Sequence, residues 1–90
     1  MQIERLSFLI TPVDRVEEFI EADEAVWDPW LKQQRGYLNK TYQRYPQGRV
    51  DIRIFWATQR DLAVAEKSPE IPALDVKLRS AFLGVYTRLP

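Results

Sequence analysis

The chain has 90 residues, 46% of them hydrophobic and 29% charged, a composition typical of one small globular domain spanning residues 1–90. Thirteen basic residues balance thirteen acidic ones, so the net charge does not favour nucleic acid or an anionic membrane as a partner. There is no cysteine and no histidine, which excludes disulfides, thiolate nucleophiles and the commonest metal ligand. The apolar runs are too short for a signal peptide or a membrane span. We therefore expect a cytoplasmic protein without a metal or cofactor.

Residues 3–10 alternate in character and predict a first strand. Because successive side chains of a strand point to opposite faces, two sets of residues separate. One face carries Leu6, Phe8 and Ile10, and the other carries Ile3, Arg5, Ser7 and Leu9.

A helix is expected to follow this strand directly. Thr11 provides an N-cap residue, and Pro12 suits the first helical position, so the helix should begin at Pro12. Pro29 lacks the N–H that continues a helix and should bend the chain after about Trp27. One further turn should then end near Gln34.

The apolar stripe of this helix contains a carboxylate. Residues placed 100° apart gather the stripe on one side of the helix, while the remaining acidic residues face water. The stripe consists of Val16, Ile20, Asp23, Trp27 and Leu31, with Phe19 and Trp30 at its margins. Asp23 therefore needs a partner or a function.

Two β-rich segments follow Gly36, which should close the helix. Residues 37–45 and 49–57 are joined by the turn sequence PQG and predict a hairpin. Alternation in the second segment places four apolar residues on one face: Val50, Ile52, Ile54 and Trp56.

The C-terminal third predicts a divided helix and a last strand. Thr58 with Asp61 three residues later resembles an N-terminal capping pattern, and a second helical segment begins at Pro72. Gly84 should end this segment, and residues 85–89 read as a short strand.

The resulting order, βαββαβ, is typical of the α+β class with a ferredoxin-like fold, an antiparallel four-stranded sheet covered by helices on one face. The opposite face is too apolar for open water and too charged for a dry core, as in a wet subunit interface. We predict that this face forms a homodimer through Arg5, Leu9, Asp51, Arg53 and Phe55.

The pattern FIEADEAVW…L…GYLNK…VDIRIFWAT…F…Y resembles a family of small uncharacterised proteins, known mainly from cyanobacteria. That family lies within the dimeric α/β-barrel superfamily, which includes the antibiotic-biosynthesis monooxygenases. The chain departs from the family pattern at Pro29 with Trp30 and at Arg35. The resemblance implies a homodimer whose two sheets face each other, and it implies no known reaction. It rests on Phe19, Asp23, Trp27, Gly36, Leu38, Lys40, Ile54, Trp56 and Phe82.

The superfamily resemblance also implies a place for a ligand, the cleft between sheet and helices, where relatives hold small aromatic substrates or haem. Trp56 followed by Thr58 is similar to the strand-three tryptophan and small hydroxyl residue of that superfamily. Haem degradation is not expected, because the axial histidine of that branch has no counterpart here. The candidate cleft residues are Asp23, Trp27, Trp30, Lys40, Tyr42 and Trp56.

For Asp23, we predict a buried ion pair with Lys40 and a hydrogen bond from Tyr42, because alternation along residues 38–42 places Leu38, Lys40 and Tyr42 on the covered face. The alternative is a general base or ligand anchor. The three tryptophans likewise serve either core packing or an aromatic pocket, and Trp27 and Trp56 should be neighbours.

Three functions remain open. The first is a homodimeric barrel protein that binds a small hydrophobic or aromatic ligand, or serves as an accessory protein, with no established catalysis and no assignable catalytic residue. The second is a cofactor-free monooxygenase acting on small aromatic substrates. The third is RNA binding, which is disfavoured because GRVDIRIFW lacks the glycine–aromatic signature of RNA-recognition sheets.

Overall fold

The computed structural model describes all 90 residues and has the βαββαβ order expected from the sequence. Two short 3₁₀ turns, at Val13–Arg15 and Pro46–Gly48, interrupt the chain, and the second helical segment is divided in two as predicted. The elements are β1 (Gln2–Thr11), α1 (Val16–Leu31), β2 (Tyr37–Arg44), β3 (Arg49–Trp56), α2 (Gln59–Glu66), α3 (Ile71–Ala81) and β4 (Val85–Arg88).

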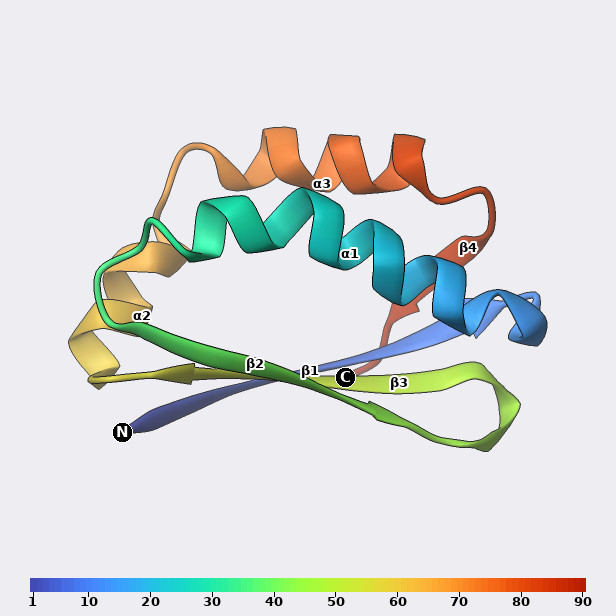
Figure 1. Ribbon diagram of the computed structural model, residues 1–90, viewed down its shortest axis with the longest axis horizontal. Coiled ribbons are helices and arrows are strands. Elements are labelled where there is room, and N and C mark those ends of the chain that lie inside the picture. The colour runs from blue at the N-terminus through green and yellow to red at the C-terminus, as the bar shows by residue number, and fades with distance from the viewer.

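The four strands form one antiparallel sheet in the order β2-β3-β1-β4. Figure 1 shows α1 and α3 lying over the same face of this sheet, with α2 at one end of the sheet. The predicted ferredoxin-like α+β fold is therefore confirmed.

The core lies between the sheet and the helices, and strand β3 supplies its centre. The side chains of Val50, Ile52 and Trp56 are at most 1% exposed, while their neighbours in sequence face away from the helices. Phe19 of α1 is completely buried and contacts three further rings, those of Phe8, Phe82 and Tyr86. The residues predicted for the covered face of β1 and β3 all belong to this core or pack against it.

The entry to α1 differs from the prediction. Thr11 is the last residue of β1 and caps nothing, and the peptide bond before Pro12 is cis. The chain first makes the 3₁₀ turn at Val13–Arg15, and α1 begins at Val16. Pairing of Thr11 with Val85 of β4 explains the difference. It holds Thr11 in β1, although the local sequence favours Thr11 as the N-cap of the helix.

The helix also does not end before Pro29, because α1 continues through this proline to Leu31. A proline inside a helix costs roughly 3 kcal/mol. Trp30 and Leu31, beyond the proline, are 8% and 2% exposed, and burying two such side chains contributes roughly 1.5–3 kcal/mol each. Core packing of the last turn therefore outweighs the local cost of Pro29.

Strand β2 contains an irregularity that alters its faces. Tyr37 pairs with Trp56 and Lys40 pairs with Ile54. The two β2 residues between these pairs, Leu38 and Asn39, therefore oppose the single β3 residue Phe55 in a β-bulge. Leu38 lies within this bulge and is 55% exposed, so its predicted place on the covered face is wrong. Lys40 and Tyr42, beyond the bulge, pair with buried residues of β3 and do face the helices.

The opposite face of the sheet has no helix over it and carries the residues predicted for a subunit interface. Ile3 lies directly across from Phe55, and Arg5 directly across from Arg53. Leu9, on the same face, is 40% exposed, and Asp51 is bound by Arg49. This face therefore combines apolar side chains with an unfavourable pair of like charges.

Candidate functional site

A cavity of about 310 Å³ lies between the covered face of the sheet and helices α1 and α3. All four strands and both helices contribute to its wall, which is mostly apolar. Pockets that hold small ligands have this volume and character. The lining residues are Glu4, Leu6, Phe8, Asp23, Trp27, Leu31, Lys40, Ile52, Ile54, Ile71, Asp75, Leu78, Arg79, Tyr86 and Arg88.

A buried charge network forms part of this wall. The ammonium of Lys40 donates to Asp23 Oδ2 and, at 3.0 Å, to Asp28 Oδ1, and the Tyr42 hydroxyl also donates to Asp23 Oδ2. The side chains of Lys40 and Asp23 are 4% and 7% exposed, so water contributes little to their solvation. The contact predicted between Asp23, Lys40 and Tyr42 is therefore present and fixes α1 to β2.

The network changes the acidity of its tyrosine. Burial, followed by the negative charge of Asp23, raises the pKa of Tyr42 far above its ordinary value. Tyr42 is therefore a permanent hydrogen-bond donor to Asp23 at physiological pH.

A second polar group in the wall has no partner at all. The hydroxyl of Tyr86 is fully buried and makes no hydrogen bond within the protein. Burial raises the pKa of this phenol, so it stays protonated and able to donate. Buried hydroxyls are nearly always hydrogen-bonded, so this donor is an exception among the polar groups of the protein.

Glu4 places a carboxyl group on the covered face of the sheet. Trp56 Nε1 donates to Glu4 Oε1 at 3.2 Å. Burial raises the pKa of the Glu4 carboxyl, although the hydrogen bond from Trp56 acts in the opposite direction. A carboxyl group with a raised pKa beside a cavity is suited to exchanging protons with a ligand.

The six predicted cleft residues divide into two groups. Asp23, Trp27 and Lys40 line the cavity. Tyr42 is connected to the cavity through its bond to Asp23, and Trp30 and Trp56 are buried in the core and do not line the cavity. The roles of all six in ligand binding stay predictions.

Trp27 and Trp56, predicted to be neighbours, belong to two different aromatic pairs. Trp27 packs edge-on against Trp30 with ring centres 5.8 Å apart, and Trp56 packs against Tyr37 at 6.1 Å. Trp27 and Trp30 lie three residues apart within α1, so their side chains are neighbours on the surface of the helix.

Five polar residues of the cavity wall are missing from the sequence prediction: Glu4, Asp75, Arg79, Tyr86 and Arg88. Alternation places Glu4 on the same face as Leu6, Phe8 and Ile10, so the signal for an inward carboxyl was present in the sequence. For Tyr86 no local signal exists, because its position depends on the pairing of β4 with β1.

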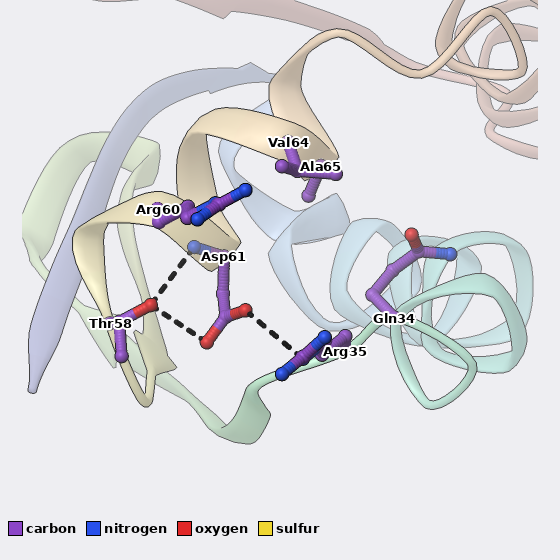
Figure 2. Close-up of a pocket in the computed structure, with 7 residues that line it drawn as sticks. All are labelled: Gln34, Arg35, Thr58, Arg60, Asp61, Val64 and Ala65. Carbon is purple, nitrogen blue, oxygen red and sulfur yellow. Dashed lines mark hydrogen bonds and ion pairs between the residues drawn. The ribbon is translucent and has the colours of Figure 1, made fainter.

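A larger hollow, of about 450 Å³, lies beside α2 and is shown in Figure 2. Its wall is largely polar, and Asp61 at its centre is bound by Thr58 and lies 4.0 Å from the Arg35 guanidinium. The predicted cap at Thr58 is confirmed here, since its Oγ accepts from the Asp61 backbone N–H. The smaller cavity is the better ligand site because its wall is mostly apolar and is built from several elements.

Neither a metal site nor a membrane span is evident from the arrangement of the residues. No three carboxylate, histidine or cysteine side chains converge closely enough to bind a metal ion. None of the helices combines the length and the apolar character needed to cross a bilayer.

Comparison with solved structures identifies the fold. The monooxygenase from the gene ActVA-Orf6 of Streptomyces coelicolor, in complex with Nanaomycin D, superposes with a TM-score of 0.72 at 18% identity, covering 97% of this chain and 81% of that one. SnoaB, a cofactor-independent oxygenase from Streptomyces nogalater, superposes with a TM-score of 0.68 at 13% identity. The match covers 98% of this chain and 89% of SnoaB. A Bordetella bronchiseptica protein provisionally assigned as an antibiotic biosynthesis monooxygenase superposes with a TM-score of 0.69 at 17% sequence identity. The match covers 98% of this chain and 93% of the Bordetella chain.

The chain thus has the fold of the antibiotic-biosynthesis monooxygenases, which is the fold inferred from the sequence. No protein-family model matches the sequence, and no curated protein matches it significantly. Identities below 20% establish a shared fold, whereas a shared reaction has to be argued from the site itself.

Proposed function

We propose that the protein binds a small, planar, largely apolar ligand in the cavity between the sheet and helices α1 and α3. The observation that carries this proposal is a cavity of about 310 Å³ whose wall is mostly apolar and also holds charged side chains from α1, α3 and the sheet. The aromatic and aliphatic part of the wall would cover a ring, and the charged side chains would bind its polar substituents. The complex of a similar fold with Nanaomycin D is consistent with a ligand in this class of protein.

The test uses a two-ring aromatic probe and a pair of matched variants on α3. Ile71 lines the cavity, whereas Val76 on the same helix is 64% exposed and does not. Isothermal titration calorimetry with 2-naphthol should show saturable binding to the wild-type protein and to Val76→Trp. Ile71→Trp should abolish it, because the larger ring occupies the cavity. If Ile71→Trp and Val76→Trp bind 2-naphthol equally well, the probe binds outside this cavity and the proposal is wrong.

A second candidate function, cofactor-independent oxygenation, is favoured by Glu4. A carboxyl group whose pKa is raised by burial can take a proton from a phenolic substrate and return it later. In the overall reaction, a phenol becomes a quinone: one oxygen atom of O₂ becomes the second carbonyl oxygen, and the other leaves as water with the phenolic hydrogen and the ring hydrogen that is replaced. SnoaB, which shares the fold, is a cofactor-independent oxygenase.

Oxygen uptake distinguishes this candidate from binding alone. The wild-type protein and Glu4→Gln are incubated with a panel of quinols and flavonoid-like phenols in air-saturated buffer. Enzymatic turnover predicts uptake above the protein-free rate and at least a tenfold loss in Glu4→Gln, since general base catalysis contributes roughly 10²–10⁴-fold. Binding without uptake would leave the protein as a ligand-binding module.

We also propose that the open face of the sheet pairs with a second copy of the chain. Phe55 and Ile3 form an apolar centre on this face, and the opposed Arg5 and Arg53 need acceptors that a second copy could provide. Light scattering at micromolar concentration should give twice the chain mass. Phe55→Asp should give a folded monomer, while Val76→Asp on the outer side of α3 should stay dimeric. A monomeric wild-type protein would refute the pairing.

A further inference from the structure

One oxygen of the Asp23 carboxylate is not used by the protein. Both donors that reach this group, the Lys40 ammonium and the Tyr42 hydroxyl, bind Oδ2, and Oδ1 has no hydrogen bond. Asp23 lines the cavity, and its side chain is only 7% exposed. The Tyr86 hydroxyl is the one fully enclosed side-chain polar atom without a partner, so the unbonded Oδ1 of Asp23 keeps some accessible surface.

A purely structural ion pair does not account for this arrangement. Lys40 is bound by Asp28 as well as by Asp23, so two carboxylates surround one ammonium and leave one negative charge in excess. Asp28 is 26% exposed and would neutralise Lys40 at a lower cost in desolvation. Asp23 adds a second buried negative charge, and its Oδ1 has no hydrogen-bond donor. Burying this oxygen lowers the stability of the fold unless a ligand provides a donor.

The neighbours of Asp23 also fix its orientation. Two donors from β2 hold Oδ2, so the carboxylate plane cannot rotate freely and Oδ1 keeps one direction. Binding sites that orient a ligand use this kind of preorganised acceptor, which neighbouring groups hold in place. Tyr42, which lies outside the cavity lining, matches that supporting role.

We propose that Asp23 is the specificity-determining acceptor of the cavity. Its Oδ1 accepts a hydrogen bond from a hydroxyl group on the aromatic ligand, and Lys40 and Tyr42 are its positioning residues. The inference rests on the proposed ligand-binding function and adds a chemical class: a planar aromatic with a free ring hydroxyl, in preference to the same ring with that hydroxyl blocked.

The test compares 2-naphthol with 2-methoxynaphthalene, which has the same ring system but no donor. The wild-type protein should bind 2-naphthol at least about tenfold more tightly, the usual scale for a hydrogen bond to a charged group. In Asp23→Asn, the amide oxygen keeps the place of Oδ2 because both neighbours are donors, and the NH₂ group replaces Oδ1. A donor then faces the ligand, and the preference should disappear.

Two control variants isolate Asp23 from its surroundings. Asp28→Asn removes the other carboxylate on Lys40 without altering a residue of the cavity wall, and Asp75→Asn removes a different carboxylate of that wall. Both should retain the preference for 2-naphthol. If Asp23→Asn does not fold, the test uses Glu4→Gln, which removes the rival acceptor of the cavity wall. This variant has to keep the preference for 2-naphthol over 2-methoxynaphthalene, even if its affinity for both probes changes.

The outcomes separate the two proposals. If the wild-type protein binds both probes equally, or if Glu4→Gln or Asp75→Asn abolishes the preference, the assignment of Asp23 is wrong and the ligand-binding function survives. If neither probe binds, the proposed function fails, and the role of Asp23 fails with it.

Discussion

The free energy of the buried Asp23–Lys40 pair can be measured by a double-mutant cycle. Lys40→Met leaves Asp23 and Asp28 without their cation, and removing one partner of a buried ion pair costs roughly 3–5 kcal/mol. Asp23→Asn should lie at the lower end of this range, because its amide oxygen still accepts from Tyr42 and Lys40 keeps Asp28. A 90-residue domain has only about 5–15 kcal/mol of stability, so both losses are measurable.

The assay is urea unfolding of the four proteins at pH 7 and 25 °C, with the slope of the transition checked for constancy. The double variant should lose about 1–3 kcal/mol less unfolding free energy than the sum of the two single variants. The reason is that, once one partner has been replaced, replacing the other no longer leaves a buried charge unpaired. Losses that add to within about 0.5 kcal/mol would refute the pair as a coupled unit. A control cycle on the exposed pair Glu17–Arg44 should show little coupling, since water screens it.

Three further predictions follow from individual positions. Trp27→Ala should cost roughly 1–3 kcal/mol in urea unfolding, less than the 3–5 kcal/mol of a fully buried tryptophan, because one side of Trp27 borders the cavity; a full core-sized loss would contradict this. Gly36→Ala should cost more than about 1 kcal/mol, because φ is +83° and the new Cβ would lie 2.5 Å from Asp61 Cβ; unchanged stability would mean that this turn relaxes. The raised pKa of Glu4 favours its protonated form in the folded state, so its stabilising contribution is lost as pH rises through the folded pKa. Between pH 4 and 7, Glu4→Gln should therefore gain stability relative to the wild type, and a constant difference across that range would exclude the effect.

Several features were determined by the sequence alone, because each depends on near neighbours in the chain. The alternation of Val50, Ile52 and Trp56 identified the buried face of β3, and Thr58 identified the start of α2. The position of Asp23 on an apolar helix stripe required a buried partner, and the basic residue of the facing strand provided it. These inferences use periodicity and charge, which are local properties.

Other features were decided only by the tertiary structure. Pro29 stays within α1 because Trp30 and Leu31 are buried beyond it, and Thr11 belongs to β1 because Val85 pairs with it. The bulge in β2, which turns Leu38 outward, depends on the register with β3. The cavity itself requires all four strands and two helices, so the unpartnered hydroxyl of Tyr86 has no counterpart in any local pattern. Contacts between residues distant in the chain have free energies as large as local propensities, and they determine where local rules are broken.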